Sequence, residues 1–386
     1  LWLDEMDQQP RRSFAYVGGT RDNRTGYEKA IQENVAQLRR NLMFSNSKGT
    51  GLWLYDFGPA GMDLNIRAER SQQWGVQGYW DHPDYHKVVR DFKVLADSTL
   101  HRQYRSDADV LLVYDTEVNC HTKSLFTDGD SVSLQLIDYM SLAMYYTGAV
   151  FDAVHLDDLR LVDFSPYKCV VFANTFLLDE RDKTIIREKV AQEGRHLVWL
   201  YAPGFSNGKT LDENFPGQVT GIMLAQISTI LPVVVDLHEA VGINISEKLW
   251  GRADPLFAVA DPEARVFGHF RHSGFPALAS KSLPGYTSWF SAVPLLDQRS
   301  LRFILGQAGV HFYCDEKEVV YAGSGFTDEH DVTPAGVSTT PNRLSPCSPT
   351  GRTVQAPRAV VANNDKVVQS IDRQRGGAGA GRVDRT

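Results

Sequence analysis

Two acidic residues near the start of the chain are the first side chains whose type and spacing could do chemistry. Glu5 and Asp7 stand two residues apart, after the apolar run of residues 1–3 and before Pro10. Such a run predicts a buried strand and proline ends regular backbone structure, so both carboxylates are expected just past a strand. Carboxylates can act there as nucleophiles or general acids and bases. From residue types alone, exposed loop acids are the simpler interpretation.

Three tryptophans form a second group, because a planar aromatic ring can cover the apolar face of a sugar ring. Trp74 and Trp80 lie in a stretch rich in glycine and tyrosine, whereas Trp53 lies within the apolar run of residues 51–58. A tryptophan inside such a run is more often a core residue. We therefore favour Trp80, with Trp74, as the residues that contact a ligand.

Other polar clusters give no support to metal or thiol chemistry. His82 and His86 are four residues apart, but no third ligand follows, and no metal or cofactor is expected. The chain has four cysteines without a Cys-x-x-Cys pair, so we expect reduced thiols rather than a zinc site or a disulfide framework. Cys120 and His121 are adjacent, and neighbours on an extended chain point to opposite faces, which disfavours a thiolate–imidazole pair.

Length and composition indicate a folded protein of several domains. The chain has 386 residues, of which 42% are hydrophobic, and a formal net charge of -7. This length exceeds one ordinary core. Because no apolar run is long enough to span a bilayer and no basic face is evident, neither a membrane nor nucleic acid is expected as a partner. The chain opens on Leu1 rather than Met, so we expect the natural N-terminus upstream. A targeting sequence could stand there, so the location stays unknown, with the cytoplasm weakly favoured.

The candidate residues must be positioned by the elements of the first hundred residues. Apolar residues recur at helical spacing between positions 27 and 43, and the glycine-bounded run 51–58 is typical of a buried parallel strand. A second helix is expected over about residues 83–95. With the run at residues 1–3, these segments predict a strand–helix–strand unit.

A new α/β pattern follows. Apolar strand-like runs alternate with helical segments, which favours a doubly wound parallel sheet over about residues 107–236. The expected strands cover residues 109–115, 150–156, 167–173 and 194–200.

The remainder of the chain changes character twice. Segments between residues 250 and 326 are short and turn-bounded, with little helical periodicity outside 301–307, and predict a small β domain. Residues 331–386 are rich in Pro, Ser, Thr, Gly and Arg with almost no aromatic residues. Such a segment buries too little apolar surface to offset the entropy of ordering, so we expect a disordered tail.

Several of these stretches together resemble the C-terminal part of family 42 β-galactosidase-type glycoside hydrolases. Residues 4–10, Asp-Glu-Met-Asp-Gln-Gln-Pro, resemble the end of the seventh strand of that family's (β/α)8 barrel, and residues 27–58 resemble its seventh helix and eighth strand. The resemblance extends over about residues 1–325. Its most specific part is the family's β-galactosidase trimerisation domain, matched by residues 109–114, 174–179, 198–204 and 220–221, and the following β domain is matched by residues 302–313.

The resemblance implies an α/β protein with a definite order of parts. The trimerisation domain is flavodoxin-like and similar to class I glutamine amidotransferases, and it implies a homotrimer. Cys169 is expected inside a strand and no Gly-x-Cys-x-Gly elbow occurs, so amidotransferase chemistry is not expected. The implied parts are a partial barrel at residues 1–106, the trimerisation domain at 107–236, a small β domain at 250–326 and the disordered tail at 331–386.

The resemblance also implies a role for one carboxylate. In the family, a Glu shortly before Gln-Pro is the nucleophile of a retaining glycosidase, and Glu5 is the closest match. Arg11 and Arg12 stand where the family usually has glycine, and Asp7 offers an alternative nucleophile. A retaining enzyme needs a second carboxyl group about 5–5.5 Å from the first. In the family this acid/base follows the fourth strand, upstream of Leu1, so we expect the chain alone to be inactive.

Two hypotheses about function follow from these observations. The first is a fragment of a retaining glycoside hydrolase that acts on terminal β-galactosides or related glycosides, with the central domain serving oligomerisation. The second is a non-catalytic carbohydrate-binding or assembly protein built from the same modules. A Glu after an Asn at the fourth barrel strand of the full-length protein would favour the first.

Overall fold

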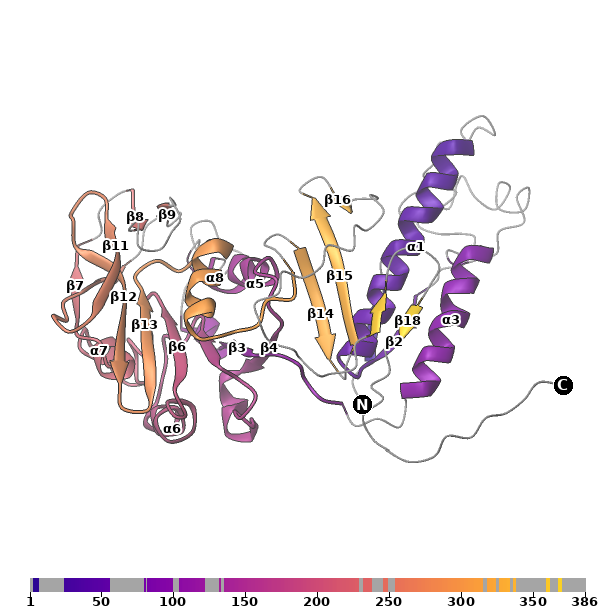
Figure 1. Ribbon diagram of the computed structural model, residues 1–386. Coiled ribbons are helices and arrows are strands. Elements are labelled where there is room, and N and C mark those ends of the chain that lie inside the picture. Colours follow the sequence, from indigo (N-terminus) through magenta and orange to yellow (C-terminus); the bar gives the residue numbers. More distant parts are fainter. Residues whose placement is uncertain are drawn as a thin grey trace, which may run out of the picture. The chain divides into compact units, whose positions relative to one another are not determined.

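The computed structural model divides into two compact units (Figure 1). The first contains residues 1–106 and 321–386, and the second contains residues 107–320. The structure describes residues 3–6, 24–55, 80, 82–99, 104–121, 132, 135–228, 232–237, 246–248, 254–314, 318–323, 326–333, 336–337, 359–361 and 367–369.

The first unit begins with two parallel strands that are connected through a helix. Strand β1 (Leu3–Met6) pairs with β2 (Gly51–Leu54), and helix α1 (Arg24–Ser47) lies between them in the chain. Helix α3 (Pro83–Thr99) follows β2 and packs against α1. Both predicted helices and the predicted strand at residue 51 are thereby confirmed, because apolar residues at helical spacing form one buried face on each helix.

One small core holds these four elements together. Apolar residues at helical spacing in α1 and α3 meet residues of both strands and one tryptophan from the connection between β2 and α3. The buried members of this core are Met6, Ile31, Val35, Leu38, Leu42, Trp80, Tyr85 and Val88.

The C-terminal strands of the chain form a sheet in the order β14-β15-β17-β18, with β16 paired to β15. The tail expected at residues 331–386 lies mostly outside the described residues, which include there only the end of β15 and strands β16 to β18. The bounds are β14 (Glu318–Gly323), β15 (Phe326–Thr333), β16 (Gly336–Val337), β17 (Ala359–Val361) and β18 (Val367–Gln369).

The second unit is built on a sheet with the strand order β4-β3-β5-β6-β13-β12-β11-β8-β9. The first five strands are parallel to one another, and from β12 onward the pairing is antiparallel. The bounds are β3 (Val110–Tyr114), β4 (Phe151–His155), β5 (Cys169–Phe172), β6 (Arg195–Leu200), β8 (Val234–Leu237), β9 (Ser246–Lys248), β11 (Arg265–Phe270), β12 (Pro276–Leu283) and β13 (Tyr286–Ser291).

Helical segments connect the parallel strands. Because parallel strands are joined by right-handed crossovers, the β3–β4 and β5–β6 connections lie on opposite faces of the sheet. Helix α5 accordingly packs with α8, and the short helix η4 packs with α6. The bounds are η2 (Glu117–Cys120), η3 (Gln135–Tyr139), α5 (Met140–Tyr145), η4 (Leu156–Leu161), α6 (Glu180–Ile185), η5 (Ile186–Val190), α7 (Phe215–Thr220) and α8 (Gln298–Gln307).

All four strands predicted for the α/β pattern are present as β3, β4, β5 and β6. The sheet nevertheless continues past them, because β13 pairs in parallel with β6 from Tyr286↔Arg195 to Ser291↔Leu200. A separate pair, β7 (Leu224–Ile227) with β10 (Leu256–Val259), is antiparallel. The boundary expected between residues 236 and 250 therefore does not divide this sheet.

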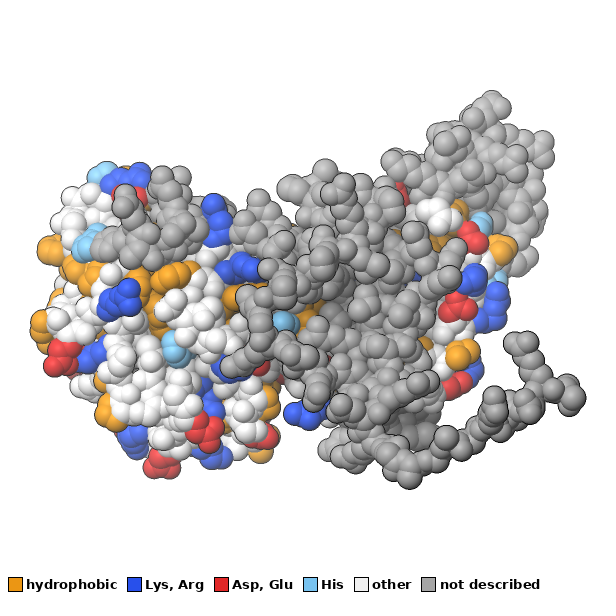
Figure 2. All heavy atoms as spheres, in the orientation of Figure 1, with side chains coloured by type: hydrophobic (Ala, Val, Ile, Leu, Met, Phe, Trp, Pro, Cys, Tyr) orange, Lys and Arg blue, Asp and Glu red, His pale blue; other side chains and the backbone are white. Residues whose placement is uncertain are grey.

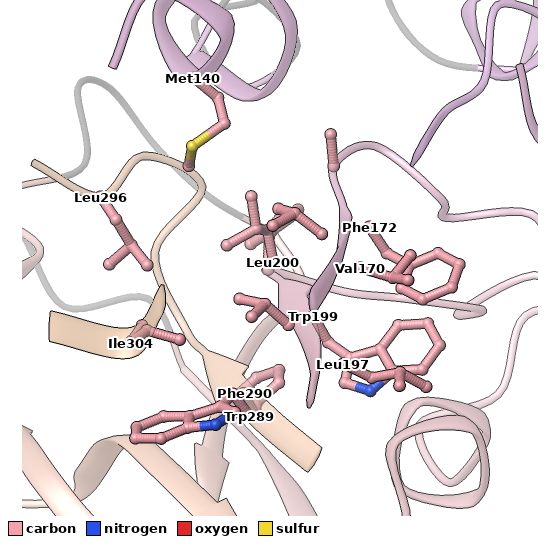
Figure 3. Packing of buried hydrophobic residues seen from close by; sticks show 14 of the residues in the cluster. Met140, Val170, Phe172, Leu197, Trp199, Leu200, Trp289, Phe290, Leu296 and Ile304 are labelled. Carbon is pink, nitrogen blue, oxygen red and sulfur yellow. The ribbon is translucent and has the colours of Figure 1, made fainter. Parts of the chain in front are cut away.

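A single hydrophobic core also extends across that expected boundary. Trp199 of β6 stacks on Phe172 of β5, with ring centroids 4.1 Å apart, and Phe290 of β13 lies beside them in the same cluster (Figure 3). Ile304 of α8 belongs to it as well. Strands β5, β6 and β13 carry buried residues on both faces, as expected for central strands covered on both sides.

His196 gives this core a dependence on pH. Its Nδ1 accepts a hydrogen bond from the buried indole N–H of Trp289 at 3.1 Å, and burial lowers the pKa of the imidazole. The unfolded state, with a pKa of about 6.5, therefore binds a proton that the folded state does not. The contribution of neutral, buried His196 to the free energy of unfolding is fully present above pH 6.5. It is lost as the pH falls below that value toward the lowered pKa of the folded state.

We predict that His196→Gln flattens the dependence of the unfolding free energy on pH between 7 and 5, because glutamine retains an acceptor but does not titrate. Urea denaturation at several pH values measures this slope. His272→Gln, at an exposed position after β11, is the control and should retain the wild-type slope. An unchanged slope in His196→Gln would contradict the assignment.

Candidate functional site

The candidate site begins at the register between β1 and β2. Glu5 is the register partner of Trp53, and Met6 is the partner of Leu54. Met6 is buried in the core with α1 and α3, and Leu54 packs against the same core. Side chains alternate across a strand, so positions 5 and 53 lie on the face directed away from the helices. Trp53 is 45% exposed, as this alternation requires.

Aromatic residues continue along this face beyond the end of β2. The Tyr55 amide donates to the Met6 carbonyl oxygen at 3.2 Å, so the parallel ladder extends one residue past the strand. The Tyr55 ring meets the Trp53 indole edge to face, with centroids 5.5 Å apart and planes at 85°. The two rings form a pair, which we call the Trp53–Tyr55 wall. Its exposed indole face could stack on a planar or sugar-like ligand.

Trp80 differs from the sequence-based expectation. It is 8% exposed, its indole N–H donates to the Tyr55 carbonyl oxygen at 3.0 Å, and its ring packs edge-on against Tyr85 at 5.8 Å. The exposures of Trp53 and Trp80 are thus the reverse of those expected. The signal that could have found Trp53 is its place between Leu52 and Leu54, which both pack against the helices.

The remaining predicted residues are only partly described. Glu5 lies within β1 rather than just past the strand, because β1 spans Leu3–Met6, and its side chain is outside the described part of the structure. Asp7 and Trp74 also lie outside the described residues. Their proximity to the Trp53–Tyr55 wall therefore stays a prediction.

His82 and Cys169 have structural positions. His82 accepts a hydrogen bond from the Asp84 amide at 3.2 Å, which caps the start of α3. Cys169 is fully buried in β5, as predicted, and burial raises the pKa of its thiol, whereas Cys120 is exposed. Across the described ranges, no group of three or more His, Cys, Asp or Glu residues is arranged to hold a metal ion. No described helix combines the length and apolar character of a membrane span.

Sequence reasoning missed a polar cluster in the second unit, at the carboxyl ends of the parallel strands. Asn174, after β5, accepts from the Asp115 amide at 2.8 Å and donates to the Asp115 carbonyl oxygen. His155 Nε2, at the end of β4, accepts from the Thr116 amide at 3.0 Å and lies 3.6 Å from an Asp115 carboxylate oxygen. Burial raises the pKa of Asp115, although the Glu117 amide opposes this shift by donating to the carboxylate. These contacts fix the loops after three strands.

Comparisons with known proteins identify the fold. No family model and no curated protein matches the sequence. The structure is similar to β-galactosidase from Bacillus circulans sp. alkalophilus, with 15% identity, a TM-score of 0.56 and coverage of 73% of this chain. It is also similar to a catalytic mutant of Gan42B, a GH42 β-galactosidase from G. stearothermophilus, with 16% identity, a TM-score of 0.54 and coverage of 76%.

These similarities define the class of fold. The chain has a glycoside hydrolase-like fold, and the relationship to family 42 β-galactosidases inferred from the sequence is confirmed at the level of that fold. The chain spans 43% of the length of each of these two proteins.

The scaffold behind the wall depends on a buried hydrogen bond between α1 and α3. Asn34 Nδ2 donates to the Tyr85 hydroxyl oxygen at 2.8 Å, and both residues are buried. Removing a partner from a buried hydrogen bond costs about 1–3 kcal/mol, because the other group loses its compensation for desolvation.

We predict that Tyr85→Phe increases hydrogen exchange of the α1 and α3 amides, through a loss of about 1–3 kcal/mol in local stability. Asn34→Leu should have a similar effect. The double variant should lose less than the sum of the two, since the hydrogen bond is shared. Strict additivity would show that the bond contributes nothing.

Proposed function

We propose that this chain is part of a retaining glycoside hydrolase similar to β-galactosidases, which hydrolyses terminal β-galactosides or related glycosides. The observation that carries the proposal is the β1–β2 register. It assigns position 5 to the face of the exposed Trp53, away from the helices that cover the other face. In an α/β barrel the face away from the helices is the interior, and the carboxyl ends of the strands bear the active site.

The proposed chemistry uses Glu5 as the nucleophile. Its carboxylate oxygen attacks the anomeric carbon while a second carboxylic acid protonates the leaving oxygen, and a glycosyl-enzyme forms. The second group then removes a proton from water, which attacks the same carbon and releases the carboxylate. Asp7 is the alternative nucleophile. The Trp53 indole is the proposed platform for the sugar ring in place of Trp80, and Trp74 stays a candidate contact.

Oligomerisation is the proposed role of the second unit, as a flavodoxin-like domain that assembles a homotrimer. The order of its parallel strands along the sheet, β4-β3-β5-β6-β13, is the doubly wound order 2-1-3-4-5. Strand β4 is at one edge of the sheet. Leu142 and Leu161, on the segments before and after β4, are 44% and 74% exposed. Exposed apolar side chains beside a sheet edge support an interface there.

The visible surface of the second unit mixes apolar and charged side chains (Figure 2). On the face of the second unit shown in Figure 2, hydrophobic side chains are interspersed with charged side chains of both signs. Leu211, 68% exposed in the segment before α7, is an apolar residue away from β4 along the chain and offers a matched control.

We predict that Leu161→Asp, alone or with Leu142→Asp, shifts the protein from trimer to monomer, because the charge must be desolvated at the interface. Light scattering on the full-length protein measures the mass. Leu211→Asp should leave the mass unchanged. A wild-type protein that is monomeric at high concentration would refute the trimer, and equal effects of all three changes would refute the interface.

We predict that Glu5→Gln in the full-length protein lowers kcat for an aryl β-galactoside at least roughly a thousandfold, because the amide cannot form the glycosyl-enzyme. The fold should survive, since the replacement is nearly isosteric. Azide should restore turnover with an activated substrate by filling the vacated space and attacking from the same face.

Asp7→Asn is the matched control for this experiment. If Asp7 were the nucleophile, the two variants would exchange phenotypes, and near wild-type rates in Glu5→Gln would rule out Glu5. Sugar binding by a wild-type protein that shows no turnover would favour the non-catalytic carbohydrate-binding alternative.

A further inference from the structure

We infer that Trp80 is a positioning residue that holds the Trp53–Tyr55 wall in the orientation needed to bind the sugar. The inference rests on the proposed function, because it assigns to Trp80 a role in substrate binding that acts through Trp53. Trp80 itself is buried and makes no stacking surface available to a ligand.

Trp80 is buried, and its indole N–H needs an acceptor because an indole nitrogen can only donate. The acceptor here is the backbone carbonyl of Tyr55, 3.0 Å away and one residue beyond β2. The Trp80 ring is fixed in turn by Tyr85 of α3. The hydrogen bond therefore ties the end of β2 to the helical layer.

Two hydrogen bonds hold the backbone of Tyr55, one at its amide and one at its carbonyl. Its amide is held by the Met6 carbonyl oxygen of β1, and its carbonyl is held by Trp80. Both peptide groups that flank the Tyr55 side chain are thus fixed. Loss of the Trp80 N–H would remove the hydrogen bond to the carbonyl and widen the range of backbone dihedrals open to Tyr55.

The position of Tyr55 in turn affects the orientation of the Trp53 indole, because the two rings are in contact. The Tyr55 ring lies edge-on to the Trp53 indole at 85°, which limits the orientations open to that indole. Stacking requires the sugar and the ring to be parallel and in contact, so a small rotation of Trp53 weakens binding. The bond made by Trp80 is remote from the reacting atoms, and its loss should raise KM while kcat is unchanged.

The test compares two buried tryptophans in the full-length protein, with p-nitrophenyl β-galactoside as the substrate. Trp80→Phe keeps an aromatic ring but removes the donor, and it should raise KM roughly three- to tenfold with kcat unchanged. Trp289→Phe is the matched control, because it removes a comparable indole hydrogen bond, to His196 in the other unit. It should lower the melting temperature without changing KM.

A third variant separates this inference from the proposed function. Trp53→Ala should raise KM at least as much as Trp80→Phe, and combining the two should add nothing further. An increase in Trp53→Ala with none in Trp80→Phe would overturn the positioning role alone. A wild-type protein that does not hydrolyse the substrate, or an unchanged KM in Trp53→Ala, would overturn the proposed site and this inference with it.

If Trp80→Phe does not fold, Trp80 can be replaced by 3-benzothienylalanine, which keeps the two fused rings and lacks only the N–H. The same rise in KM in this variant would support the positioning role. Wild-type KM in a folded benzothienylalanine variant would overturn it.

Discussion

The parallel ladder between β6 and β13 is the constraint on which the second unit depends. It joins segments that begin at Arg195 and Tyr286 into one sheet. In the strand order of this sheet, β12, β11, β8 and β9 are linked to the first four strands through this pair. Arg195, 3% exposed at the start of β6, donates to the carbonyl oxygens of Phe164, Tyr167 and Val190. A buried guanidinium is tolerated only when its donors are satisfied, so this side chain fixes the ladder's start against the loop before β5 and the end of η5.

The local elements were predictable from sequence because each one carries its own periodicity. Central strands such as β5 and β6 are continuous apolar runs, and α1 repeats apolar residues at helical spacing. The extent of the sheet was not predictable in this way. Strand β13 is a short run bounded by turns, and its own sequence does not indicate that β6 is the strand it pairs with. Pairing across about ninety residues of chain is decided by packing on both faces, which a local pattern does not contain.

The candidate site shows the same limit at the scale of single residues. The sequence analysis expected carboxylates and tryptophans close to the strands of one α/β unit. The structure contains both strands, β1 and β2, and Trp80 packs in the core of this unit. Trp53 was expected to be buried and Trp80 exposed, and the structure shows the opposite. The expectation for each ring was based only on the residues next to it in the sequence. A tryptophan outside the strands can be buried when its indole N–H donates to a backbone carbonyl, as in Trp80. A tryptophan within a strand can be exposed when the residues on either side of it point to the buried face, as in Trp53.

The register narrows the choice of nucleophile further than residue types do. Position 5 pairs with Trp53, which is exposed, whereas the flanking Leu52 and Leu54 pack on the helical core. Strand β1 ends at Met6, so the β1–β2 register assigns a face to position 5 and not to position 7. The paired strands fix the backbone at position 5. A nucleophile must be held at a constant distance from the anomeric carbon, and a backbone fixed by strand pairing supports the proposed choice of Glu5.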